Sequence, residues 1–311
     1  MQVTALKVNN LINPMGLEGQ SPKFRWMIVA DNGEEGILQA AYQIQVAKDG
    51  KILWDSGKVE SSESIGVHYT GPELKSRQRY YWRVKIWNGG SDDQVTEWSP
   101  EAFWEMGLLD KSDWKAKWIT YPWEEDSKKT NPAPYLRKEF DYYGNDPLRL
   151  FISSLGLYQV FINGELVTDH LFTPVWSVLD QEVQYQVYDV TNILDQGKNV
   201  ISVVLLDGWY RGKISGAGKP NVYGKRLALI AQISTVNGRT ILATDNTWKA
   251  SIGGIREVDF RDGIVYDSRL EPDGWKQLGF DDNSWGSTTK LEGFTPELVE
   301  TTTEPIRFQE K

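Results

Sequence analysis

Helical periodicity is nearly absent from this chain of 311 residues, and that absence limits the fold more than any other feature. Apolar residues instead alternate with polar ones in short runs, which Gly, Asn, Asp and Pro interrupt. Strict alternation places successive side chains on opposite faces of a strand that buries one face. The sequence therefore predicts an all-β protein made of β-sandwiches.

The clearest strands lie in the first third of the chain. Residues 41–47 and 80–88 both alternate, and Asp49-Gly50 marks a hairpin turn after the first of these runs. We expect one face of each run to be buried, which gives this set of core residues: Tyr42, Ile44, Val46, Tyr80, Trp82, Val84 and Ile86. The pattern predicts a fibronectin III/Ig-like β-sandwich over residues 1–107.

The rest of the chain divides into three further segments. Residues 108–134 end in Asn131-Pro132-Ala133-Pro134, after a charged stretch, so they are expected to form a connector, with residues 114–119 as a candidate short strand. At least six apolar strands and the hairpin signal Asn163-Gly164 predict a second sandwich, a jelly roll, over 135–290. Residues 291–311 are expected to be a linker to a downstream domain that is absent here.

Composition excludes several functional classes. The net charge of −9 argues against nucleic acid as a partner, since a phosphate backbone requires a basic surface. The chain has no cysteine, so disulfides and thiolate chemistry are excluded. No apolar run approaches the roughly 20 residues that cross a membrane. The first residues lack the pattern of a signal peptide, so a cytoplasmic protein is expected.

Residues 205–212 read Leu-Leu-Asp-Gly-Trp-Tyr-Arg-Gly and follow an apolar strand directly. A strand that only contributes to a core would end in a polar turn. Aromatic rings and charges at the point where a strand becomes a loop are typical of recognition surfaces. This octet is therefore the first place to look for a site.

Several sequence blocks occur in one order in the second region: 156–164, Pro174-Val175-Trp176, 183–191, the octet, Asn221-Val222-Tyr223-Gly224 and Tyr266-Asp267-Ser268-Arg269. This series resembles the N-terminal portion of bacterial α-L-rhamnosidases, which are inverting glycoside hydrolases with an (α/α)6-barrel catalytic domain. Residues 42–47, 54–57 and 79–84 resemble the leading sandwich of that family. The resemblance covers essentially the whole chain. It implies a parent enzyme that hydrolyses terminal α-L-rhamnosides.

In that family the catalytic acid and base lie in the helical barrel, and nothing in this chain resembles the barrel. Its Cys-Pro-Gln-Arg motif cannot be present in a chain without cysteine. The resemblance therefore implies a non-catalytic scaffold or interdomain module, and its partner is the catalytic barrel of the same polypeptide. It leaves homo-oligomerisation open.

Inverting hydrolysis of a glycoside requires two carboxyl groups, one as general acid and one as general base. The densest acidic cluster lies in residues 259–282, where Asp267, Arg269 and Glu271 alternate as on one face of a strand. A cation between two acids lowers their pKa values, whereas a general acid needs the opposite shift. The family usually carries Glu where Ile264 stands here. No catalytic residue is expected in this chain.

Carbohydrate binding is the alternative function. Some members of the family carry a calcium-dependent rhamnose-binding module with this jelly-roll fold. The resemblance places its ligand loops around these residues: Trp176, Asp180, Asp207, Trp209, Tyr210, Arg211, Asn221 and Tyr223. Asp180, Asp207 and Asn221 could supply oxygen ligands to calcium, and no other cofactor is expected. In the family, Thr-Asp usually follows this tryptophan. Here Ser177-Val178 stands in its place, so one acidic residue is missing from the expected set of calcium ligands.

Two hypotheses therefore stay open at this point. In the first, the chain is an interaction module, and Trp176, Trp209 and Tyr210 pack against the catalytic domain. In the second, it is an autonomous carbohydrate-binding module for rhamnose-containing glycosides. A third reading, an independent hydrolase, would require turnover of a rhamnoside by this chain alone.

Overall fold

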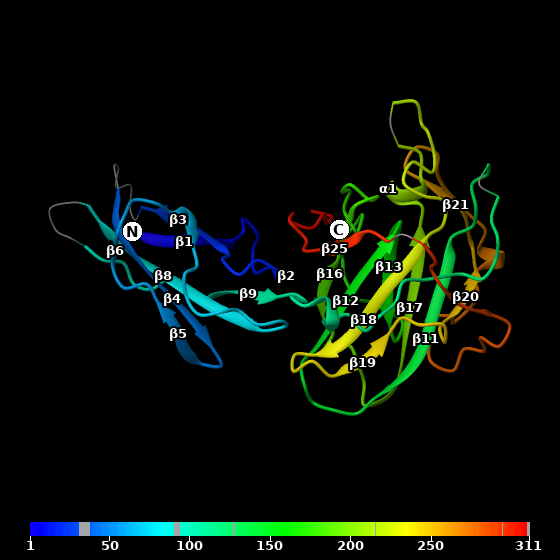
Figure 1. The fold of residues 1–311 in the computed structure, drawn as a ribbon, viewed down its shortest axis with the longest axis horizontal. Coiled ribbons are helices and arrows are strands. Elements are labelled where there is room, and N and C mark those ends of the chain that lie inside the picture. The colour runs from blue at the N-terminus through cyan, green and yellow to red at the C-terminus, as the bar shows by residue number, and fades with distance from the viewer. Residues whose placement is uncertain (31–37, 90–93, 127, 215, 294, 310–311) are drawn as a thin grey trace. The chain divides into compact units, whose positions relative to one another are not determined.

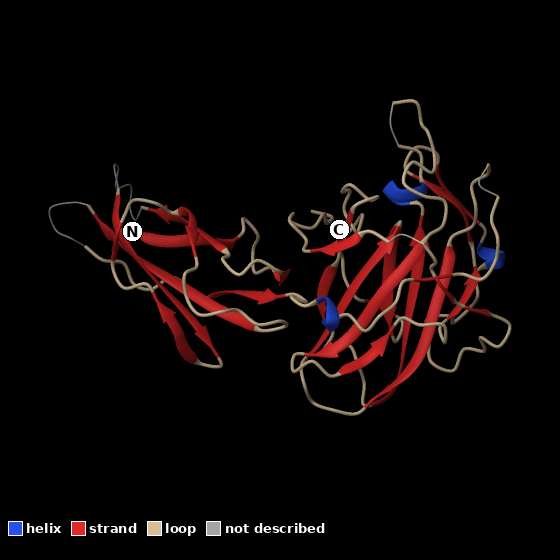
Figure 2. Ribbon diagram, viewed as in Figure 1, coloured by secondary structure: helices blue, strands red, loops and turns tan. Residues whose placement is uncertain are grey.

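The computed structural model describes all residues except 31–37, 90–93, 127, 215, 294 and 310–311 (Figure 1). The chain forms two compact units, Met1–Asp110 with Thr302–Glu304, and Lys111–Thr301 with Pro305–Lys311. Strands dominate both units, so the all-β prediction is confirmed (Figure 2). Helix in the described residues is limited to short turns: η1 (Lys111–Asp113), α1 (Gly208–Arg211) and η2 (Ser268–Leu270). None of the described helices is long and apolar enough to cross a membrane.

The first unit is an Ig-like sandwich of two sheets. The larger sheet has the order β2-β9-β8-β4-β5, with β6 also paired to β4, and contains β2 (Met15–Leu17), β4 (Gln39–Lys48), β5 (Lys51–Asp55), β6 (Val59–Glu60), β8 (Arg79–Asn88) and β9 (Ala102–Met106). The smaller sheet has the order β1-β3-β7 and contains β1 (Gln2–Val8), β3 (Lys23–Val29) and β7 (Ile65–His68).

The alternation seen in the sequence sets the core of this unit. Tyr42, Ile44 and Val46 of β4 are buried while the glutamines between them are only half-buried. The same pattern holds along β8, as predicted. Asp49 and Gly50 adopt φ values of 51° and 72°, which join β4 to β5 in the left-handed turn that suits the twist of a hairpin.

The second unit contains two six-stranded sheets. One has the order β14-β13-β17-β11-β20-β23 and contains β11 (Pro134–Tyr142), β13 (Leu157–Ile162), β14 (Glu165–Leu166), β17 (Gly197–Leu206), β20 (Lys249–Ile252) and β23 (Gly286–Ser287). The other has the order β16-β12-β18-β10-β24, with β19 beside β18, and contains β10 (Ile119–Thr120), β12 (Leu148–Leu155), β16 (Gln186–Asp189), β18 (Ala228–Thr235), β19 (Thr240–Ala243) and β24 (Thr289–Lys290).

Two smaller ribbons complete this unit. β15 (Glu182–Gln184) pairs in parallel with β25 (Glu297–Val299), and β21 (Ile255–Asp259) forms a hairpin with β22 (Gly263–Tyr266). Apolar side chains from both large sheets form one buried cluster, which includes Leu136, Leu150, Ile152, Val160, Ile201, Val203, Leu229 and Trp248. The Asn163-Gly164 turn is confirmed as the hairpin between β13 and β14, with φ values of 51° and 86°.

The segment 108–134, expected to be a connector with a short strand near residues 114–119, contributes β10 to a sheet. Ile119 pairs with Leu229 of β18 and with Lys290 of β24. Residues 291–311, expected to be a linker, also pair with the second unit. β25 adds to β15, and Thr301 Oγ1 donates to the carbonyl of Tyr185 at 2.8 Å. Both segments were assigned by composition, which does not reveal partners that are distant in the chain.

Candidate functional site

The octet lies where β17 ends and the single helical turn α1 begins. Gly208 occupies φ +50°, and a Cβ built on it would lie 2.4 Å from Leu157 Cγ. Only glycine fits both the backbone conformation and this close approach. The turn places Trp209 and Tyr210 half-buried at the edge of the sandwich and places Asp207 and Arg211 inside it.

Gly208→Ala should therefore destabilise the second unit by about 1–3 kcal/mol, since strain and overpacking act together. Urea denaturation followed by tryptophan fluorescence measures the change. Gly216→Ala is the matched control, because a Cβ at Gly216 has nothing within 4 Å. Equal stability of the two variants would show that the contact with Leu157 is not a constraint.

Arg211 is the centre of a buried polar network. Its side chain is 4% exposed, its Nε donates to Asp207 Oδ1 at 2.8 Å, and its Nη1 donates to Glu125 Oε2 at 2.5 Å. Nη1 also lies 3.2 Å from the Tyr121 hydroxyl, which itself donates to Glu125. Glu125 and Tyr121 come from the segment predicted to be a connector, and no sequence motif links them to Arg211.

Two buried carboxylates thus share one guanidinium. Burial raises the pKa of Asp207 to about 6, although Arg211 beside it acts in the opposite direction. Because the pKa in the folded state exceeds the usual value of 3.8, this carboxyl makes the fold more stable as the pH falls from about 6 towards 3.8. Asp207 and Arg211 therefore join α1 to the sandwich through a buried ion pair, and their predicted part in ligand binding stays a prediction.

Four aromatic side chains form a continuous surface cluster, which we call the aromatic cluster: Phe172, Trp176, Trp209 and Phe260. Trp176 stacks on Trp209 at 5.3 Å with 9° between the ring planes, and Trp209 contacts Phe260 at 4.1 Å. Phe260 in turn contacts Phe172 at 5.6 Å. The structure thus brings the predicted Trp176 and Trp209 together and adds two phenylalanines that the sequence analysis did not include.

Tyr223 lies beside this cluster, because Trp176 Nε1 donates to its hydroxyl at 3.0 Å. Tyr210 points elsewhere. Its ring packs against both neighbouring core clusters and leaves no room for a side chain at Gly224. Of the eight predicted binding residues, Trp176, Trp209 and Tyr223 thus lie together at the surface, whereas Asp207 and Arg211 are buried.

The predicted calcium ligands do not form an evident acidic cluster. Asp180 is exposed, Asp207 is paired with Arg211, and Asn221 adopts φ +58° in the following loop. Within the described residues, no group of three or more His, Cys, Asp or Glu side chains could hold a metal ion. Calcium binding at Asp180, Asp207 and Asn221 stays a prediction.

Asp267, Arg269 and Glu271 were predicted to share one face of a strand, with the cation paired to the acids, and only part of this is confirmed. Residues 268–270 form the turn η2, so the three side chains do not share the face of a strand. The ion pair is confirmed, since Arg269 Nη2 lies 2.7 Å from Asp267 Oδ2 and lowers the pKa of that carboxyl. Glu271 accepts from the Tyr135 hydroxyl at 2.7 Å and from Trp275 Nε1 at 2.9 Å, which is a structural role.

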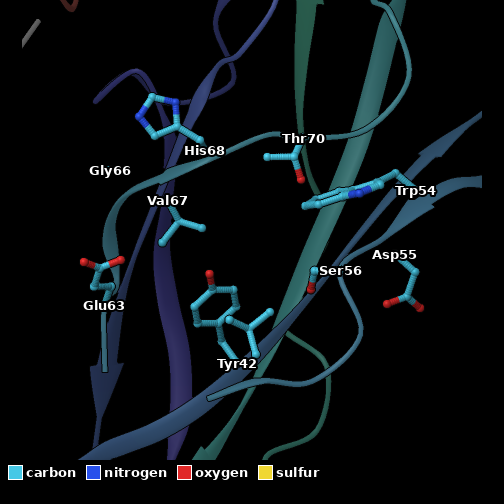
Figure 3. Close-up of a pocket in the computed structure, with 10 residues that line it drawn as sticks. Tyr42, Trp54, Asp55, Ser56, Glu63, Gly66, Val67, His68 and Thr70 are labelled. Carbon is cyan, nitrogen blue, oxygen red and sulfur yellow. The ribbon is translucent and has the colours of Figure 1, made fainter. Parts of the chain in front are cut away.

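A separate pocket of about 380 Å³ lies in the first unit (Figure 3). Its lining includes Tyr42, Trp54, Asp55, Glu63 and His68. Alternation along β4 predicts that Tyr42 faces the core, and the exposed loop residues around it form no recognisable motif.

Comparison with known proteins gives consistent matches over both units. Residues 146–310 match the alpha-L-rhamnosidase N-terminal domain, which is more than half of the chain. Residues 3–110 match the Rha78A-like N-terminal immunoglobulin domain. An α-L-rhamnosidase of Formosa agariphila is 35% identical over 306 residues, which cover 90% of this chain and 32% of the relative. The chain spans about a third of the length of the curated relatives it matches first.

Solved structures agree with this result. The α-L-rhamnosidase of Aspergillus terreus has a TM-score of 0.86 and 32% identity, covering 96% of this chain and 35% of that chain. The α-L-rhamnosidase of Dictyoglumus thermophilum has a TM-score of 0.85 and 31% identity, covering 100% of this chain and 36% of that chain.

Proposed function

This chain belongs to the family of α-L-rhamnosidase N-terminal domains, and we propose that it serves as the non-catalytic front portion of an α-L-rhamnosidase. The observation that carries the proposal is the alignment, in which 90% of the chain corresponds to 32% of a full-length relative. The parent enzyme hydrolyses terminal α-L-rhamnosides with carboxylates from a helical barrel elsewhere in the polypeptide. The two sandwiches act as its scaffold.

The aromatic cluster is the surface that we assign to contact with the barrel. Trp176 is 51% exposed and Phe172 is 43% exposed, and the neighbouring Val178 and Val222 are exposed as well. Isolated apolar residues are common on protein surfaces, but rings in mutual contact form a patch that favours association. Arg211, Asp207 and Glu125 fix the turn beneath Trp209, so the patch is rigid before it binds.

The chain alone should not hydrolyse p-nitrophenyl α-L-rhamnoside, while the full-length enzyme should. A separately produced barrel should bind this chain in a titration, and a Trp176→Ser, Phe260→Ser double variant should bind at least about tenfold more weakly, as loss of buried anchor residues predicts. Tyr143→Ser is the matched control, because Tyr143 is 70% exposed and outside the cluster. Turnover by the chain alone would contradict the scaffold role, and unchanged affinity of the double variant would contradict the assigned surface.

The second candidate is an autonomous module that binds L-rhamnose with calcium. One observation favours it, since the Tyr223 hydroxyl holds the half-exposed Trp176 ring in place as a flat plate. Calorimetric titration with L-rhamnose, with and without calcium, separates the two functions. Saturable binding that Trp176→Ala abolishes would support the module, whereas heats equal to dilution in both conditions would exclude it.

A further inference from the structure

The pocket of the first unit opens at one side of the Ig-like sandwich, between the segment that carries β5 and β6 and the neighbouring β7 (Figure 3). Its volume of about 380 Å³ is near the lower end for pockets that enclose small ligands. The residues around it come from both sheets: Tyr42, Trp54, Asp55, Ser56, Val59, Glu63, Gly66, Val67, His68 and Thr70.

One wall of this pocket is the indole ring of Trp54, which neighbouring side chains hold in place. Trp54 packs edge to face against Tyr69 at 5.2 Å and in parallel with Phe24 at 6.5 Å. Gly71 approaches the indole so closely that an added Cβ would lie 2.7 Å from Trp54 Cγ. Figure 3 shows the ring edge-on above Ser56, with one face toward the space over Tyr42. The ring is therefore held from behind and available from the pocket.

The Tyr42 hydroxyl is the strongest sign of a ligand. The residue is 8% exposed, its ring contacts Trp26 at 5.3 Å, and its hydroxyl points toward the pocket (Figure 3). The hydroxyl makes no hydrogen bond to the described residues and is open to the pocket, so its hydrogen-bonding capacity is available there. A ligand that donates to or accepts from it would satisfy the group.

The other polar groups indicate the charge of that ligand. Asp55 accepts from Gln43, Gln45 and the Gly57 amide, and Ser56 donates to the Gly57 carbonyl, so both are already engaged. The lining contains no Lys or Arg, which disfavours phosphate and carboxylate. Hydroxyls from Tyr42 and Thr70, with the Glu63 carboxylate at the rim, suit a neutral molecule with several hydroxyl groups.

We propose that this pocket binds one pyranose residue of a neutral glycan. The indole of Trp54 contacts the C–H face of the sugar ring, and the Tyr42 and Thr70 hydroxyls bond to its hydroxyl groups. This site concerns the first unit alone and does not rest on the role proposed for the aromatic cluster. It gives the Ig-like unit a binding function in addition to a structural one.

Indole N–H resonances of the full chain, followed by NMR, test this proposal with L-rhamnose, D-mannose and D-galactose as probes. The Trp54→Phe variant assigns the Trp54 signal. At least one of the sugars should shift this signal saturably, in the millimolar range that a single polar site of this size supports. Tyr42→Phe should weaken the binding roughly tenfold, because it removes one hydrogen bond and keeps the ring packing. Thr70→Val provides a second hydroxyl deletion at an exposed position.

Tyr81→Phe is the matched control, since it removes the same atom from the outward face of β8 and should leave the affinity unchanged. A Trp54 signal that no sugar moves would overturn the proposal, and so would equal affinities of Tyr42→Phe and Tyr81→Phe. Choline and inorganic phosphate are tested as a cationic and an anionic probe. Tighter binding of either one than of the sugars at this pocket would also overturn the proposal. A shift of the Trp176 signal alone would place sugar in the second unit and not here.

Discussion

Arg211→Met should destabilise the second unit by about 3–5 kcal/mol, because it leaves the buried carboxylates of Asp207 and Glu125 without their shared cation. Arg211 pairs with Glu125 Oε2, and Glu125 Oε1 is buried with no hydrogen-bond partner within the described residues. Hydrogen exchange read by mass spectrometry measures the loss, and peptides from the first unit serve as an internal reference. Adding Asp207→Asn and Glu125→Gln to the variant should restore part of the stability.

The loss from Arg211→Met should also depend on pH. Removing the guanidinium raises the pKa of Asp207 further above its present value of about 6, so the folded variant takes up a proton as the pH falls. The destabilisation should therefore be smaller at about pH 5 than at about pH 8. Arg269→Met is the control, since Arg269 is exposed and an exposed ion pair contributes little to stability. A loss similar to that of the control would contradict the assigned role of Arg211.

Arg137→Met should have a comparable effect, about 3–5 kcal/mol, on the same unit. Arg137 is fully buried on β11 and donates to the carbonyls of Trp275 at 3.2 Å and Gln277 at 3.1 Å, as well as to Glu139 at 3.0 Å. It also pairs with Asp282. Its side chain therefore attaches residues 275–282 to the sheet, and methionine would remove the donor that these carbonyls and the Asp282 carboxylate share.

Limited proteolysis distinguishes this effect from a general loss of stability, because residues 275–282 should become the first site of cleavage. Lys138→Met is the matched control on the next position of the strand, where the ammonium contacts Thr247 at the surface. Arg137→Lys should recover little, since an ammonium cannot reproduce the planar fork of five donors. Protection of this segment in Arg137→Met would contradict the prediction.

Local patterns predicted the parts of the fold that depend on neighbouring residues. The alternation in β4 and β8 specified which side chains face the core, and Asp49-Gly50 specified the turn because its conformation is a local property. In the second unit, the ordered series of blocks indicated the family. Neither kind of signal shows which distant segments meet.

The features that the sequence did not predict depend on contacts between segments that are distant in the chain. Residues 114–119 were a candidate strand by local pattern, but the partners of Ile119, which are Leu229 and Lys290, are far away in the chain and leave no local signal. Glu125 joins Arg211 across 86 positions for the same reason. The aromatic cluster was predicted only in part, because Phe260 and Phe172 reach Trp209 through tertiary contacts.

The pairing of β10 with β24 also constrains how the protein can form during synthesis. The described strands of the first unit's two sheets all lie between Gln2 and Met106, so these sheets can form while the rest is still being made. The second unit cannot complete its sheet until Lys290 leaves the ribosome, and β15 waits for Val299. Nascent chains that pause before this point expose unpaired strand edges and apolar surface, so they are the species most dependent on chaperones.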